Sequence, residues 1–198
     1  MLKVWNFKII GLYLTLIIVL SFTSSVIAAE EGQDSSITGT QGTRQSFTHT
    51  VLAEDLTGTW CQYCPAASGA LKSIYDSGDY PFFFVSLIED VNDDAHSRCT
   101  DDYNVAGYPT VIFDGGYDEV IGGGENVESN YRDAIENCGD RSVPDLDLTI
   151  TAEPLGDAEL EIAVVITNND ASSYSGDLRV FITEIESRYD DYDGNPYP

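Results

Sequence analysis

The hydrophobic positions between residues 47 and 142 change their spacing several times along the chain. Short apolar runs indicate strands, and apolar stripes at helical spacing indicate helices. The pattern predicts strands over 50–56, 81–88, 110–113 and 117–121, and helices over 65–77, 94–103 and 126–138. Because the run over 81–88 is almost entirely apolar, we expect this strand to be buried on both faces. The order βαβαββα is typical of an α/β layer fold.

From residue 143 onward, apolar and polar residues alternate. Leu146, Leu148 and Ile150 alternate with Asp and Thr, residues 160–166 repeat the pattern, and residues 178–185 form a third apolar run. This alternation predicts three antiparallel strands with one buried face. A β-sandwich usually has about seven strands. We therefore interpret 143–198 as an incomplete antiparallel β-sandwich (Ig-like) module, either truncated or completed by a partner.

Residues 1–29 have the pattern of an export signal. Two lysines precede an apolar run over 9–22, and small residues ending at Ala29 are typical of a cleavage site. The alternative is an uncleaved anchor, because residues 9–29 carry no charge and are long enough to span a bilayer. Residues 30–46, rich in Gly, Ser, Thr and Gln, indicate a flexible linker. Both interpretations predict an exported protein, secreted or at the cell surface, with membrane contact only if the leader is retained.

Acidic residues dominate the composition. The chain has 34 Asp and Glu against 9 Lys and Arg, a net charge of −25 that becomes −27 once the two leader lysines are removed. Such a surface repels nucleic acid and anionic membranes, which excludes nucleic acid as a partner. Because the acids are spread along the whole chain, we interpret them as a solvated surface rather than a cation site.

Two cysteines stand three positions apart in Trp60-Cys61-Gln62-Tyr63-Cys64, directly before a predicted helix. One helical turn brings such residues within the Cα separation of about 4.4–6.8 Å that a disulfide needs. The first cysteine then lies at a helix N-terminus, where the dipole favours the thiolate. The thiolate is the attacking species in disulfide exchange. The spacing therefore predicts a redox-active pair that needs no other cofactor.

This pair is followed about 45 residues later by Gly107-Tyr108-Pro109-Thr110, and the combination resembles the thioredoxin-like superfamily. In that superfamily the proline is cis and lies beside the redox pair. The resemblance covers the α/β pattern, so we place the domain at residues 47–142. It implies a thioredoxin-like three-layer α/β/α fold.

The resemblance also assigns roles to individual residues. It implies that Cys61 is the nucleophile and that Cys64 resolves the mixed disulfide. Trp60 would shape the substrate surface, and the backbone at Tyr108 and Pro109 would pair with an extended substrate segment.

A buried acid precedes the first cysteine by six residues in this superfamily, and Asp55 holds that place here. It would accept the proton of the resolving thiol. A strand shift of one residue would put Glu54 there instead. The alternative is that Asp55 is an exposed acid at the end of a strand.

The dipeptide Gln62-Tyr63 brings no positive charge to the cysteine pair, and the surroundings are acidic. Both conditions disfavour a thiolate. A less stable thiolate favours the disulfide. We therefore expect a moderately or strongly reducing pair.

The sequence predicts an exported thiol–disulfide oxidoreductase that acts on protein thiols and disulfides and is regenerated by a redox partner. One alternative is a non-catalytic extracellular binding or adhesion protein with a structural Cys61–Cys64 disulfide. Another is a zinc site formed by this pair with His96 and Cys99, although export argues against a metal. Cys99 and Cys138 each lie on an apolar stripe, so they are either buried thiols or partners in a second, structural disulfide.

Overall fold

Strands and helices alternate along residues 47–142 of the computed structural model, which describes residues 7–8 and 47–198. The elements follow the predicted order. They are β2 (Val51–Thr57), α1 (Cys64–Ser77), β3 (Phe82–Ile88), α2 (Asp93–Ser97), the π-helical turn η1 (Arg98–Asp102), β4 (Thr110–Phe113), β5 (Asp118–Ile121) and α3 (Val127–Gly139). The predicted leader and linker lie outside the described residues, except for a short strand, β1 (Phe7–Lys8).

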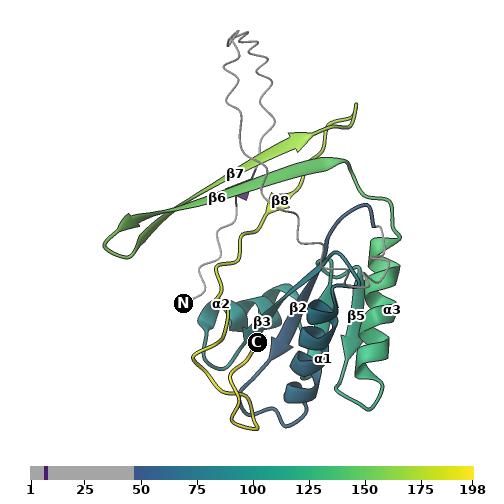
Figure 1. Cartoon of the computed structure of the whole chain (residues 1–198), viewed down its shortest axis with the longest axis vertical. Coiled ribbons are helices and arrows are strands. Elements are labelled where there is room, and N and C mark those ends of the chain that lie inside the picture. The colour runs from purple at the N-terminus through teal and green to yellow at the C-terminus, as the bar shows by residue number, and fades with distance from the viewer. Residues whose placement is uncertain (1–6, 9–46) are drawn as a thin grey trace, which may run out of the picture.

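The sheet has the strand order β3-β2-β4-β5 (Figure 1). β2 runs parallel to β3 and antiparallel to β4, and β4 runs antiparallel to β5. This register places Asp55 of β2 between Ser86 of β3 and Val111 of β4. The acid therefore lies on a central strand.

Successive residues of β2 and β4 point to opposite faces of the sheet, which divides the core in two. One core lies under α1 and α3 and includes Ala53, Leu71 and Tyr131. The other lies under α2 and η1 and includes Leu56 and Cys99. Helices on both faces confirm the predicted three-layer arrangement.

β3 is buried on both faces over most of its length, as predicted. Phe82 and Ile88 are buried on one face, and Val85 and Leu87 are buried on the other. The exception is Phe83, which is 57% exposed near the start of this edge strand.

The helix predicted over 94–103 differs from the prediction. It is split into α2, which Asn92 caps by accepting a hydrogen bond from the backbone of Ala95 (3.0 Å), and the π-helical turn η1.

The β-sandwich predicted over 143–198 is not confirmed. β6 (Leu146–Gly156) and β7 (Glu159–Asn168) form a two-stranded antiparallel ribbon in which no residue is buried. Of the third predicted strand only β8 (Asp177–Leu178) forms, and it pairs with β1 rather than with the ribbon. The expected buried face is absent from these described strands because no second layer lies against them.

Residues 186–198 return from the ribbon to the α/β domain, and the last of them lie beside β3 (Figure 1). Tyr197 is fully buried there. Between residues 47 and 198 the structure has no helix that is long and apolar enough to cross a bilayer.

Candidate redox site

Cys61 and Cys64 form a disulfide, with sulfurs 2.08 Å and Cα atoms 5.4 Å apart. Cys64 is the first residue of α1, and its backbone N–H donates to the Cys61 carbonyl (3.2 Å). Pro65 follows in the first turn, where a helix tolerates a residue without an N–H group. The first turn of α1 contains no acidic residue. The first turn of α1 therefore adds no negative charge at the positive end of the helix dipole. A carboxylate is nevertheless bound just before the pair, where Asp90 accepts the backbone N–H of Thr59 (2.9 Å).

Aromatic side chains flank the disulfide. Trp60 and Tyr63 are more than half exposed, whereas Cys61 is 3% exposed and Cys64 is buried. The Trp60 ring packs edge-on against Tyr108, with centroids 5.6 Å apart. The Tyr108–Pro109 peptide bond is cis, as the resemblance implied. The structure therefore brings Trp60 and Tyr108 together next to the disulfide.

Gly123 is a site residue that the sequence reasoning missed. A Cβ atom at this position would lie 2.6 Å from the Tyr63 carbonyl oxygen and 3.4 Å from Pro109 Cγ. Only glycine allows this loop to approach the redox turn and the proline at once. The run Gly122-Gly123-Gly124 was the available signal.

Asp55 is buried on the α1 side of the sheet. Its Oδ2 accepts a hydrogen bond from Ser68 (2.6 Å) and a longer one from Ser86 (3.5 Å). Its buried Oδ1 accepts none from the described residues. Desolvation raises the pKa of Asp55 to about 6, although the serine hydrogen bonds oppose the shift. Ser68 stands one helical turn after Cys64, so the acid is linked to the cysteine-bearing helix.

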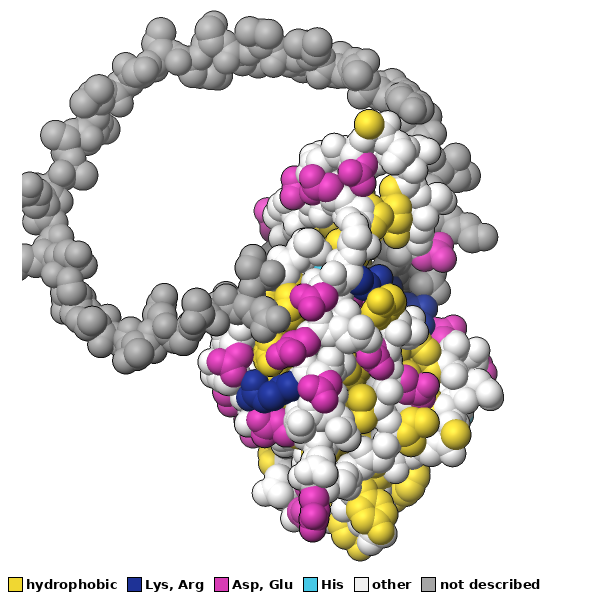
Figure 2. All heavy atoms as spheres, turned by 90° about the vertical axis from the view of Figure 1, so that its right-hand side faces the viewer, with side chains coloured by type: hydrophobic (Ala, Val, Ile, Leu, Met, Phe, Trp, Pro, Cys, Tyr) yellow, Lys and Arg dark blue, Asp and Glu magenta, His cyan; other side chains and the backbone are white. Residues whose placement is uncertain are grey.

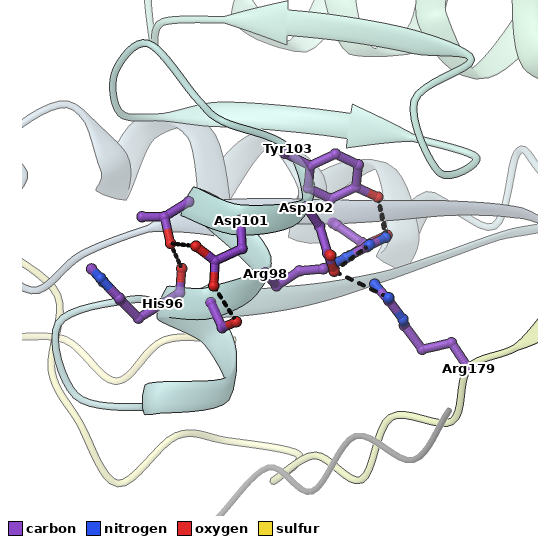
Figure 3. Close-up of polar contacts among 9 residues, drawn as sticks. His96, Arg98, Asp101, Asp102, Tyr103 and Arg179 are labelled. Carbon is purple, nitrogen blue, oxygen red and sulfur yellow. Dashed lines mark hydrogen bonds and ion pairs between the residues drawn. The ribbon is translucent and has the colours of Figure 1, made fainter. Parts of the chain in front are cut away.

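Glu54 points to the other face and does not take the place of Asp55. Arg98 binds both of its carboxylate oxygens, at 2.7 and 2.8 Å. Tyr103 donates to the same carboxylate (2.6 Å). Figure 3 shows Asp102 joining this network, between Arg98 (2.9 Å) and Arg179 (3.1 Å). The alternation of β2 thus separates a paired acid from one that has no cationic partner among the described residues.

Cys99 and Cys138 are free and buried, so the second disulfide is not formed. Cys99 lies in the core under η1, and Cys138 lies in the core under α3. These two cores lie on opposite faces of the sheet. The elements that carry the two thiols therefore cannot meet, which the apolar stripes alone did not reveal.

We expect Cys99 and Cys138 to be inert towards thiol reagents in the folded protein. Burial raises the pKa of each thiol to about 12, so the reactive thiolate is scarce at neutral pH. Titration of the oxidised protein with a chromogenic disulfide reagent should label no cysteine when folded and both in denaturant. Rapid labelling of either thiol in the folded protein would contradict this assignment.

The zinc alternative has no support from this geometry. Cys61 and Cys64 are joined in a disulfide. His96 pairs with Glu89 (2.8 Å), and Cys99 is buried. Across residues 47–198, no three His, Cys, Asp or Glu side chains are grouped so that they could hold a metal ion.

Acidic side chains are scattered over the surface, and Figure 2 shows few basic ones on the same face. Between residues 47 and 198, the five arginines and one lysine all form ion pairs with acids, and His49 and His96 also contact carboxylates. The arginines and the lysine are Lys72, Arg98, Arg132, Arg141, Arg179 and Arg188. Most carboxylates thus face solvent without a cationic partner.

No protein-family model and no curated protein sequence matches the chain. Among solved structures, it is similar to a mutant thioredoxin from Halobacterium salinarum, with 20% identity, a TM-score of 0.38, and 48% of this chain and 80% of that chain covered. The oxidised thioredoxin from Plasmodium falciparum gives 19% identity and a TM-score of 0.34, covering 46% and 83%. The strand order, the helices on both faces and the disulfide at the start of α1 give this chain a thioredoxin-like fold.

Proposed function

We propose that the protein is an exported thiol–disulfide oxidoreductase that reduces protein disulfides with Cys61 and Cys64. The observation that carries the proposal is the disulfide at the N-terminus of α1, flanked by exposed Trp60 and Tyr63. An exposed aromatic surface beside a nearly covered sulfur pair suits an extended protein segment as substrate. The leader-like pattern of residues 1–29 supports export.

In the proposed reaction, the Cys61 thiolate attacks one sulfur of the substrate disulfide and releases the other as a thiolate. Cys64 then gives its proton to Asp55 and attacks Cys61 Sγ, which releases the second substrate thiolate. The pair ends as a disulfide, and the substrate has gained two electrons. A dithiol redox partner reverses the change and restores the reduced pair.

Asp55 suits the role of proton acceptor because its pKa, raised by burial to about 6, lies below neutral pH yet nearer to it than that of an ordinary carboxyl. The direct test is insulin reduction by the purified protein with dithiothreitol as electron donor. Precipitation of the insulin B chain should be faster with the protein than with dithiothreitol alone. Equal rates would contradict the proposal.

We expect the pair to be reducing. Its midpoint reduction potential should lie nearer to about −270 mV, the value of thioredoxin, than to about −120 mV, the value of a strongly oxidising periplasmic disulfide oxidase. Gln62 and Tyr63 offer no cation that would stabilise the Cys61 thiolate. Equilibration with glutathione buffers, followed by alkylation and gel shift, measures the midpoint. The matched variant Tyr63→His places a cation-forming ring beside Cys61 and should raise the potential. A wild-type midpoint near the oxidase value would refute the expectation.

A binding or adhesion role is the second candidate, and the β6–β7 ribbon favours it. One face of the ribbon exposes Leu148, Ile150 and Leu160 without a covering layer among the described residues. Exposed apolar side chains gathered on one face are typical of interaction surfaces. Binding through the ribbon would not depend on the cysteines, so serine variants of the pair separate the two roles.

A further inference from the structure

Tyr197 reaches from the last described residues to the turn that carries the redox pair. Its hydroxyl accepts a hydrogen bond from Thr57 Oγ1 (3.0 Å) and donates one to the Gly58 carbonyl (2.9 Å). The same carbonyl accepts the backbone N–H of Cys61 (3.0 Å). The carbonyl oxygen of Gly58 thus accepts hydrogen bonds from both the buried tyrosine and the backbone of the nucleophilic cysteine.

The segment around Tyr197 is held in place by its own backbone. The Tyr197 N–H donates to the Tyr189 carbonyl (3.3 Å), and its carbonyl accepts the N–H of Ser187 (2.9 Å). The Pro198 carbonyl lies 3.3 Å from Ser86 Oγ. Ser86 also lies within hydrogen-bond distance of Asp55 (3.5 Å). The segment is therefore anchored on the strand that carries the acid, through Thr57, and on the neighbouring strand β3, through Ser86.

A cavity of about 920 Å³ borders this segment. Ser86, Tyr197 and Pro198 line it, whereas Asp55 does not. Asp55 is fully buried although its strand neighbour Ser86 faces the cavity. The cavity lining thus includes Tyr197 and the serine that lies 3.5 Å from Asp55, whereas the acid itself does not reach the cavity.

We propose that Tyr197 is a positioning residue of the redox site, which fixes the Cys61 turn through Gly58 and shields Asp55 from water. This inference rests on the proposed function. The tyrosine does not touch the reacting sulfurs, so it acts through the carbonyl and through the exclusion of solvent. Its effect on Asp55 is a desolvation effect, which disfavours the charged carboxylate.

Other titratable groups also surround Asp55. Tyr131 on α3 and Cys99 on the opposite face both experience its charge. On α1, Cys64 stands one turn before Ser68, which binds the acid. Tyr197 experiences the same charge, and burial raises the pKa of Tyr197 to about 12, so it stays neutral over the working range. Of these groups, Tyr197 alone lies outside the strands and helices of the α/β domain.

The test uses Tyr197→Ala and Tyr197→Phe in the full chain, with Tyr192→Ala as the matched control. Tyr192 belongs to the same segment but is exposed. The Asp55 titration is followed by carboxyl-carbon NMR of the oxidised protein, which needs no redox turnover. The rate of insulin reduction is measured from pH 5 to 9.

Tyr197→Ala should move the Asp55 titration at least one pH unit towards that of an exposed carboxyl, because water from the cavity reaches the acid. Tyr197→Phe keeps the ring but loses both hydrogen bonds. It should leave the titration in place and slow insulin reduction about threefold to tenfold. Tyr192→Ala should match the wild type in both measurements.

An unchanged Asp55 titration in Tyr197→Ala, together with an unchanged rate in Tyr197→Phe, overturns the inference. If Tyr197→Ala does not fold, the rate of Tyr197→Phe decides alone. A wild-type protein that fails to reduce insulin would refute the proposed function, while the titration would still report whether Tyr197 covers Asp55.

Discussion

Replacement of Cys61 by serine should lower insulin reduction by at least about a thousandfold, to the rate without protein. A serine hydroxyl is not ionised at neutral pH and cannot form a disulfide, so the first attack does not occur. Cys64→Ser should also stop turnover, but at a later point. Cys61 still attacks the substrate, and no second thiol releases it.

The two variants therefore differ in what they accumulate. Cys64→Ser, reduced and mixed with a disulfide-containing protein, should give a mixed-disulfide band on a non-reducing gel. Cys61→Ser should give none, because Cys64 is fully buried at the start of α1. Cys138→Ala, which removes a buried thiol away from the site, is the matched control and should keep wild-type activity.

Full activity in Cys61→Ser would refute the redox role and favour a binding protein with a structural disulfide. A mixed disulfide with Cys61→Ser but not with Cys64→Ser would reverse the assignment of nucleophile and resolving cysteine.

Asp55→Asn should make the protein more stable at pH 8 by up to about 3 kcal/mol. Burial raises the pKa of Asp55 from 3.8 to about 6, so the folded state holds this proton more tightly than the unfolded state. The stability that the neutral carboxyl provides is complete below about pH 4 and is lost as the pH rises through about 6. Asparagine remains neutral and does not lose it.

Urea denaturation at pH 4, 6 and 8 measures this effect. The wild type should lose stability relative to Asp55→Asn across the series, and the two should be nearly equal at pH 4. Asp133→Asn, at an exposed position of α3, is the control and should follow the wild type. A constant difference between Asp55→Asn and the wild type at all three pH values would show that Asp55 is not destabilised by ionisation.

Asp55→Asn should also be less active than the wild type at pH 8, despite its greater stability. Asparagine cannot accept the proton of Cys64, so the resolving step should slow by about a hundredfold. Accumulation of the mixed disulfide during turnover would locate the defect at that step. Unchanged turnover would exclude Asp55 as the proton acceptor.

The α/β domain could be predicted from local patterns because its elements are encoded locally. The apolar runs of β2 and β4 mark buried strands, and the cysteine spacing marks the start of α1. Which of the two neighbouring acids faces α1 depends on the register of β2 in the sheet. Glu54 and Asp55 are adjacent acids, and only the face towards Ser68 distinguishes them.

The predictions that failed concern burial, which depends on contacts with residues distant in the sequence. The alternation in 146–166 correctly indicates strands, but it does not say whether another layer covers them. Phe83 is the one exposed residue of an otherwise largely covered strand, which an apolar run cannot reveal. Tyr197 follows a proline in a stretch without periodicity, so no local signal marked it as a core residue.

The contact between Thr57 and Tyr197 joins residues 140 positions apart. A ribosome adds roughly 5–20 residues per second, so several seconds separate the completion of α3 from the appearance of Tyr197. During that interval the strands around Asp55 are present, and the tyrosine is still to be made. We therefore expect a newly made chain to acquire its sheet first, with a hydrated Asp55, and to exclude water from the acid only after the segment around Tyr197 has been made.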